Sequence, residues 1–557
     1  MTGIQTTSNR RRKRTSKSPK IANIISLVRN IGYSSTPYRL LISCHIPQRI
    51  SAKPSDLRTG DTAVGNDILS GSFNFLGYKL NGAAWNNFKF GEDWQIILHG
   101  FSWLRDLRVI THDSAKKKMR ELVSDWIHTH KSIDSFAWRP DILGQRLNSW
   151  LLASDFMLMD CDQKFSEKLF FSVALQSKHL SRTLRQCPDG APRFKAIKGL
   201  YSTGICIPNS KYLETAYKSL SFEIKRQILP DGSQIERSPS AHLSILSDLI
   251  DIRDSLGNAK LTIPENLQFS IDRMSSTLRS YRHGDGALAL FNDSLEETAW
   301  LIDLVLAKSN AHGRAHPAKL YSGFQRLQSG RTLIILDSGP PPSIGNKTHA
   351  GTFSFEMSIG KERIIVNCGA WRGGDESWRT ALRATAAHST LTVDDTNSSE
   401  LLSSGGIGTG AEKINSEFKQ KEGALYLSMS HDGFNEPFNL IHERQLYLSA
   451  DGSDLRGTDT LVQSKNNQAK GRSFAIRFHI HPDVQTSLVH DGNTVLLRLP
   501  SGLGWQMRVN GANLDLAESI YCGQAGKQRR SSQIVMTGPI DPTETIVKWA
   551  LSRIPKK

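Results

Sequence analysis

The spacing of hydrophobic residues changes near residue 320, and this change divides the chain into two parts. From about residue 90 to residue 310, apolar residues recur every three or four positions, which is typical of amphipathic helices. The segment 114–131 (SAKKKMRELVSDWIHTHK) is one example. Several such helices joined by short loops predict an α/α toroid over residues 70–320, since no fixed sequence repeat favours a solenoid.

After residue 325, apolar and polar residues alternate with a period of two. Segments such as RTLIILDSG (331–339) and SFAIRFHIHP (473–482) read as strands, and turn residues separate them. So many strands in one part of the chain predict an antiparallel β-sandwich over residues 325–557. The predicted fold class is therefore α+β and multidomain, with an N-terminal α/α toroid followed by a C-terminal antiparallel β-sandwich.

The net charge of +17 is concentrated at the N-terminus. Residues 1–55 hold eleven Lys or Arg and no Asp or Glu. This composition cannot bury apolar surface, so it predicts a disordered basic tail. Such a tail either solubilises the protein or makes peripheral contact with an anionic membrane or polyanion, and both interpretations stay open. Specific binding of nucleic acid has the least support, because no nucleic-acid motif accompanies the charge.

The distribution of cysteines and of apolar runs argues against several other classes of protein. The six cysteines are scattered without a C-x-x-C pair, which argues against a disulfide framework and a thiolate zinc finger. No run of eighteen apolar residues exists, so no transmembrane segment is predicted. The apolar run 21–28 is short and no small-x-small cleavage site follows it, so a secretory signal is not indicated. On this ground alone a cytoplasmic location is expected.

Two stretches carry a resemblance to a known family. They are residues 349–395 (HAGTFSFEMSIGKERIIVNCGAWRGGDESWRTALRATAAHSTLTVDD) and residues 229–243 (LPDGSQIERSPSAHL), and they resemble the heparinase II/III-like family of polysaccharide lyases. The resemblance implies β-elimination on an acidic, uronate-containing polysaccharide of the glycosaminoglycan or alginate type. It also implies a site between toroid and sandwich, a place in the cell envelope or periplasm, and no required cofactor.

Three positions depart from the pattern that the resemblance implies. β-Elimination needs a clamp on the uronate carboxylate, a base for the C5 proton and an acid for the leaving oxygen. Family enzymes use Asn or His as the clamp, with Tyr and His for proton transfer. The matching positions here hold Ala191–Pro192, Ala241 and Lys347. The alternative to a lyase is therefore a catalytically degenerate protein that binds acidic glycan.

The candidate catalytic residues are those nearest to the substituted positions in the sequence: His388, His349, His242 and Tyr201. We expect His349 and His388 to lie on adjacent strands, with imidazoles close enough to share a ligand or a polar network. The candidate substrate-binding residues are charged residues of the same two stretches: Arg379, Arg383, Glu236 and Arg237. An arginine can bind a uronate carboxylate through two parallel hydrogen bonds.

Some relatives hold a structural zinc ion in the sandwich, and the matching residues are His349, Asn367 and His388. Two imidazoles from neighbouring strands suit zinc, whereas an Asn amide is a poor third ligand. The competing interpretation is a pair of histidines hydrogen-bonded inside a polar seam.

Overall fold

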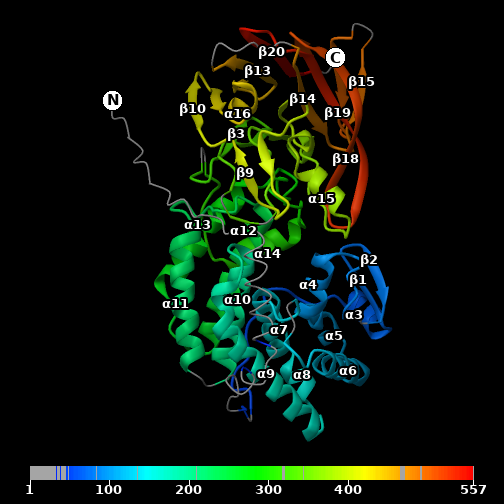
Figure 1. Ribbon diagram of the computed structural model, residues 1–557, viewed down its shortest axis with the longest axis vertical. Coiled ribbons are helices and arrows are strands. Elements are labelled where there is room, and N and C mark those ends of the chain that lie inside the picture. Colours follow the sequence, from blue (N-terminus) through cyan, green and yellow to red (C-terminus); the bar gives the residue numbers. More distant parts are fainter. Residues whose placement is uncertain are drawn as a thin grey trace.

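A computed structural model describes residues 49–555 together with residues 33, 38, 46 and 47. Short gaps lie at 83–84, 134–135, 208–209, 317–319, 343, 346, 465–470 and 490–491. A helical part is followed by a part made of two large antiparallel sheets, so the predicted fold class is confirmed (Figure 1). Most of the basic tail and the apolar run 21–28 lie outside the described residues.

The helical part contains most of the helices and one small hairpin, β1 (Ser72–Phe75) with β2 (Tyr78–Asn81). Ser238 caps its longest inner helix through a hydrogen bond from the Ala241 amide. Within the described part of the chain, no helix combines the length and apolar character needed to cross a membrane. The helices are α3 (Thr62–Leu69), α4 (Glu92–Gly100), α5 (Leu104–Arg108), α6 (Asp113–Thr129), α7 (Pro140–Leu152), α8 (Ser154–Leu158), α9 (Gln163–Thr183), η1 (Leu184–Gln186), α10 (Ala191–Cys206), α11 (Ser210–Gln227), α12 (Pro239–Asn258), α13 (Glu265–Ser280) and α14 (Ala299–Lys308).

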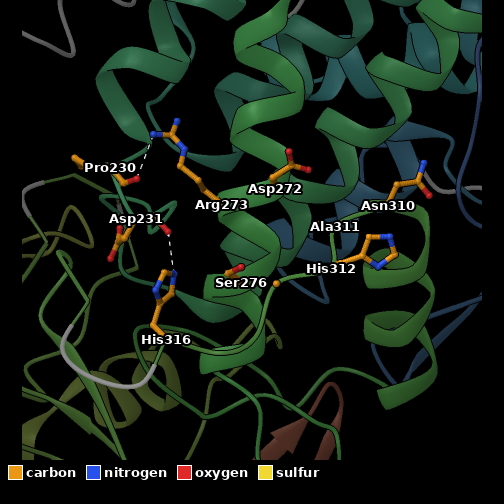
Figure 2. A pocket seen from close by; sticks show the side chains of 10 residues that line it. Pro230, Asp231, Asp272, Arg273, Ser276, Asn310, Ala311, His312 and His316 are labelled. Atoms are coloured by element: carbon orange, nitrogen blue, oxygen red, sulfur yellow. Dashed lines mark hydrogen bonds between the residues drawn. The ribbon is translucent and has the colours of Figure 1, made fainter.

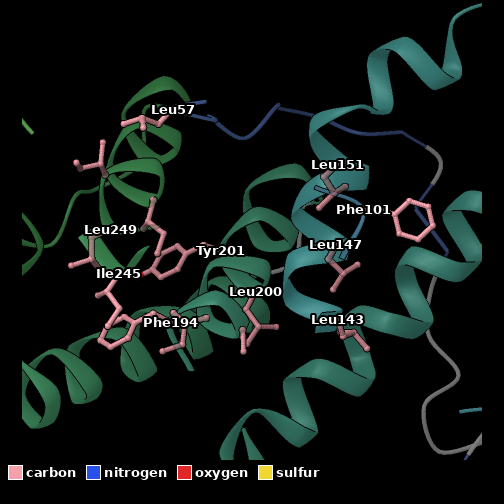
Figure 3. Packing of buried hydrophobic residues seen from close by; sticks show 14 of the residues in the cluster. Leu57, Phe101, Leu143, Leu147, Leu151, Phe194, Leu200, Tyr201, Ile245 and Leu249 are labelled. Carbon is pink, nitrogen blue, oxygen red and sulfur yellow. The ribbon is translucent and has the colours of Figure 1, made fainter. Parts of the chain in front are cut away.

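Helix α10 forms the centre of this part. It packs against α7, α11 and α12, and its side chains are buried around most of the helix, including Phe194, Leu200 and Tyr201 (Figure 3). A helix that is apolar all round is an interior helix. Its crossing with α7 is close, because a Cβ on Gly199 would lie 2.4 Å from the Cα of Gly144. Glycine is therefore required at this crossing.

The C-terminal part is a sandwich of two sheets. One has the strand order β10-β11-β12-β13-β20-β17-β16-β15, and the other has the order β18-β19-β14-β6-β5-β4-β3 with β7 paired to β14. The strands are β3 (Phe324–Ser329), β4 (Thr332–Asp337), β5 (Phe355–Ile359), β6 (Glu362–Val366), β7 (Leu391–Val393), β10 (Ile414–Lys421), β11 (Ala424–His431), β12 (Leu440–Leu448), β13 (Asp454–Gln463), β14 (Ser473–Ile480), β15 (Gln485–Leu488), β16 (Thr494–Arg498), β17 (Gly504–Asn510), β18 (Asn513–Gln524), β19 (Lys527–Pro539) and β20 (Glu544–Arg553). A small hairpin, β8 (Ser399–Leu401) with β9 (Ile407–Gly410), and the short helices α15 (Glu376–Arg383), η2 (Thr385–Ala387) and α16 (Asn435–Phe438) lie in the connections.

Aromatic residues join the two sheets. Phe355 on β5 and Phe478 on β14 belong to one sheet and contact Trp549 on β20 of the other, with ring centroids 5.9 and 4.8 Å apart. The alternating apolar residues of both sheets thus face a common core, as period two requires. The sequence change from helix to strand falls between α14 and β3.

Candidate functional site

A cavity of about 410 Å³ lies between the two parts of the chain, and we call it the interdomain cleft. On the helical side it is lined by residues at or near the N-terminal ends of α4, α7, α10 and α12, and on the sandwich side by residues of the loop 344–348 and Arg372. Helix N-termini carry unpaired amide groups and a partial positive charge, which favour anionic groups. The protein's own carboxylates lie at three of these ends: Asp93 on α4, Asp141 on α7, and Glu236, which accepts from the first amide of α10.

The three substituted positions of the family pattern meet in this cleft. Ala191–Pro192, Ala241 and Lys347 all line it, although they are far apart in the sequence. Pro192 lies in the first turn of α10 and Ala241 in the first turn of α12. The positions that the family resemblance assigned to one site therefore share one cavity, while Ala and Pro supply no group that can transfer a proton or clamp a carboxylate.

Two of the cations that line the cleft, Lys347 and Arg372, are bound to carboxylates of the protein itself. Lys347 Nζ lies 2.6 and 2.8 Å from the two carboxylate oxygens of Asp93, a residue of α4. Arg372 Nη1 lies 2.6 Å from Asp293 Oδ2 and 3.6 Å from Asp93 Oδ2. Although burial opposes ionisation, Lys347 and Arg372 hold the pKa of Asp93 well below its usual range. These ion pairs also join the helical part to the sandwich.

Glu236 is the carboxyl group of the cleft that is best suited to proton exchange. Its Oε2 accepts hydrogen bonds from the Ala191 amide and from Gln234 Nε2, each 2.9 Å long. Burial raises the pKa of Glu236 to about 7, and these two hydrogen bonds oppose the rise. A carboxyl with a pKa near neutrality inside a cleft can act as a general acid or base. Glu236 also satisfies the first amide of α10, which is a structural role.

His349 and His388 are in contact, as expected, with His349 Nδ1 3.0 Å from His388 Nε2. Neither residue lies on a strand, so the predicted placement on adjacent strands is wrong: His388 follows η2, and His349 precedes β5. The Asp293 amide donates to His349 Nε2, which makes His349 Nδ1 the donor to His388. His388 Nδ1 then donates to the Ala384 carbonyl over 2.7 Å. We call this chain of hydrogen bonds the histidine relay.

The histidine relay does not fit a zinc ion. Both nitrogens of each imidazole are engaged, and both rings are buried. The proposed third ligand, Asn367, accepts from the Ser389 amide and donates to the Leu290 carbonyl. A zinc ion would need lone pairs that these bonds already use. The polar-seam interpretation therefore describes His349, Asn367 and His388 better than the zinc interpretation.

Two other predicted catalytic residues lie inside the helical core rather than in the cleft. His242 is fully buried, its Nε2 hydrogen-bonds the Met274 carbonyl over 2.8 Å, and burial lowers its pKa to about 4. Tyr201 is also fully buried, against Tyr217, and burial raises its pKa. Neither side chain reaches a ligand in the cleft. Their prediction as catalytic residues is corrected, because both sit on the core faces of their helices.

The predicted substrate-binding arginines are structural, with one partial exception. Arg383 donates to the carbonyls of Thr348, Gly405 and Gly406, and is buried. Arg237 is buried as well and pairs with Asp337 at the end of β4. These two predictions are corrected: the guanidinium groups bind loop carbonyls or a protein carboxylate, and neither residue lines the cleft. Arg379 lies near the cleft cations, 3.7 Å from Asp93.

A second cavity, of about 480 Å³, contains none of the predicted site residues. It lies beside α13 and is lined by Asp272, Arg273, His312 and His316 (Figure 2). Arg273 donates to the Pro230 carbonyl, and His316 contacts a backbone carbonyl as well. Across the described residues, no group of three or more His, Cys, Asp or Glu is placed to hold a metal ion. The interdomain cleft therefore remains the candidate site.

A helical toroid joined to a two-sheet sandwich, with a cleft between them, is the architecture of a polysaccharide lyase class. Family models agree with this over both parts: "Heparinase II/III N-terminus" matches residues 68–312, and "Heparinase II/III-like, C-terminal" matches residues 311–550. The chain therefore belongs to the heparinase II/III-like family, and the resemblance seen in the sequence is confirmed.

Individual relatives differ in what their names describe. "FtsZ-localized protein C" of Caulobacter vibrioides is 31% identical over 545 residues, covering 94% of this chain and 93% of the relative. "Heparin-sulfate lyase" of Pedobacter heparinus is 26% identical over 411 residues, covering 62% and 60%. A solved structure of Heparinase III has a TM-score of 0.75 at 13% identity, over 97% of this chain and 92% of that one. That structural likeness concerns the fold.

Proposed function

We propose that this chain is a non-cleaving member of the heparinase II/III-like family whose interdomain cleft binds saccharide. The observation that carries the proposal is the convergence of Ala191–Pro192, Ala241 and Lys347 in one cavity. The first two positions have no ionisable side chain, and the amino group of Lys347 is bound by Asp93. Loss of a proton-transfer group typically lowers a rate by about 10² to 10⁴, so several losses together leave little elimination.

The test measures cleavage and binding in the same samples. Purified protein is incubated with a panel of uronate-containing polysaccharides and with their carboxyl-reduced forms, and the ultraviolet absorbance of the unsaturated product is followed beside a binding titration. An active heparinase III serves as the positive control for cleavage. The proposal expects saccharide binding without product. A steady rise of product absorbance above the no-protein blank would refute it.

A second candidate function is retained β-elimination on an acidic polysaccharide, with Glu236 as the proton-transfer group. The observation that favours it is the pKa of about 7 for a carboxyl that lines the cleft. This candidate predicts product formation by the wild type and its loss in Glu236→Gln. Because Glu236 also accepts from the Ala191 amide, circular dichroism has to show that the variant is folded.

We propose two partners, one from a relative's name and one from the charge of the N-terminal residues. The relative named for FtsZ localisation spans both domains, which supports the proposal that this chain also works where FtsZ assembles. Cosedimentation of the purified protein with assembled FtsZ tests this, and a protein that stays in the supernatant refutes it.

The basic residues 1–55 support a peripheral contact with anionic membranes. Flotation with anionic vesicles, but not with neutral ones, is the expected result.

A further inference from the structure

One carboxylate from the helical part occupies the cation-rich side of the cleft. Lys347, Arg372 and Arg379 belong to the sandwich part, and we call them the cation cluster. Asp93 reaches them from the first turn of α4, with oxygens at 2.6 and 2.8 Å from Lys347, 3.6 Å from Arg372 and 3.7 Å from Arg379. Only 14% of its side chain is exposed. An internal anion thus contacts all three cations.

Asp93 occupies the position from which an anionic ligand could contact all three residues of the cation cluster. A uronate entering the cleft would compete with Asp93 for Lys347, which Asp93 holds with both oxygens. Displacing Asp93 would leave a buried carboxylate without its cation, which is strongly unfavourable. Asp293 holds Arg372 through one carboxylate oxygen and its backbone carbonyl, at 2.6 and 2.7 Å. The cluster is therefore closed to a second carboxylate.

The lining of the cleft as a whole combines apolar and polar side chains and has no excess of positive charge. Six carboxylate side chains and five cationic side chains line it among the described residues. Its other polar groups are neutral hydroxyls and amides, for example Ser240, Ser244 and Gln145. Groups of this kind exchange hydrogen bonds with sugar hydroxyls, and the cavity volume of about 410 Å³ suits a small ligand or one end of a longer one.

The geometry points to Asp93 as the residue that sets ligand specificity: by occupying the cation cluster, it makes the cleft a site for an uncharged saccharide and excludes uronates. This inference rests on the proposed function, in which the cleft binds saccharide without cleaving it. It assigns a ligand class that differs from the acidic polymer implied by the family resemblance. It also makes Asp93 a specificity-determining residue rather than a catalytic one.

The experiment compares one oligosaccharide in two charge states. A glucuronate-containing oligosaccharide and its carboxyl-reduced form are titrated into the full-length protein by isothermal calorimetry. Wild type should bind the reduced form at least tenfold more tightly than the acid form. Asp93→Asn frees the cation cluster, so it should gain about tenfold or more in affinity for the acid form only. Glu92→Gln is the matched control, because it removes one negative charge from the same helical turn and Glu92 pairs with Arg139 instead.

Three results would overturn the inference: tighter binding of the acid form by wild type, no gain in Asp93→Asn, or an equal gain in Glu92→Gln. Wild type that binds neither form would overturn it as well. If Asp93→Asn does not fold, Lys347→Gln replaces it. That variant keeps the Asp93 carboxylate and removes its main cation, so rejection of the acid form should persist or increase, and a gain in acid binding would count against the inference. Unsaturated product in these titrations would refute the non-cleaving proposal separately, whatever the affinities.

Discussion

Acidification should destabilise the protein through the histidine relay, and His388→Gln isolates the contribution of one ring. Burial lowers the pKa of His388 from 6.5 to about 4, although its bond to the Ala384 carbonyl and the charge of Glu356 oppose the shift. The folded state therefore binds this proton only near pH 4, whereas the unfolded state binds it near 6.5. The resulting stability is complete above pH 6.5 and is lost as the pH falls from 6.5 towards 4.

The magnitude follows from the gap between the two pKa values. At about pH 5.5, one unit below the unfolded pKa, the unfolded state gains about 1.4 kcal/mol from protonating His388, while the folded state gains almost nothing. The full difference between a pKa of 6.5 and a pKa of about 4 corresponds to about 3.4 kcal/mol, which is approached only well below pH 4; at pH 4 itself the loss is about 3 kcal/mol. Glutamine can accept the hydrogen bond from His349 but cannot titrate.

The assay is urea unfolding of wild type and His388→Gln at about pH 7.5 and pH 5.5. Other buried histidines, such as His479, titrate in both proteins, so their contributions largely cancel in the comparison. Wild type should lose about 1.4 kcal/mol more than the variant on acidification. Equal losses in the two proteins would show that His388 titrates as freely in the folded state as in the unfolded state, and the buried relay would be refuted.

Three further changes test other features of the fold. Arg237→Met removes the cation that pairs with the buried Asp337 carboxylate, so it should lower the free energy of unfolding by about 3–5 kcal/mol. Asp337→Asn is the comparison. A loss under about 1 kcal/mol in Arg237→Met would contradict the buried ion pair. Gly199→Ala places a Cβ 2.4 Å from Gly144 and should cost about 1–3 kcal/mol in thermal or urea unfolding, so an unchanged stability would contradict the close helix crossing. Dialysis against a strong chelator should leave the melting temperature unchanged, and a marked decrease would revive the zinc interpretation of the histidine relay.

The architecture could be predicted because its signals are local. The hydrophobic period, the Ser238 cap and the turn residues each act within a few positions, and the structure follows them. The family-like stretches also placed Ala241 and Lys347 at one site, and both line the cleft. Charged residues were less informative about the binding site than hydrophobic spacing was about the fold. Arg237 and Arg383 read as ligand-binding arginines, yet both are buried against loop carbonyls, a partner that leaves no pattern in sequence.

Asp93 illustrates what sequence reasoning missed. It is separated from Lys347 by 254 positions, and nothing around either residue indicates that they meet. Asp93 reads as an ordinary acidic residue in the first turn of a helix, which is where acidic residues are expected. Only the packing of α4 against the loop before β5 turns it into the counterion of the cleft. The sequence shows that Lys347 departs from the family pattern, but it does not show that Asp93 neutralises this lysine.

Whether the charged groups of the cleft are already paired within the protein bears on its function. Catalytic sites usually hold charged groups that the rest of the fold leaves unpaired, because unpaired groups are what a substrate binds. In this cleft Lys347 and Arg372 each have a protein carboxylate, and His349, which follows the lining residue Thr348, is hydrogen-bonded to His388. These contacts stabilise the junction of toroid and sandwich at the place where a lyase would engage a uronate. The same residues cannot do both at once, so the pairing that strengthens the junction supports a binding role over elimination.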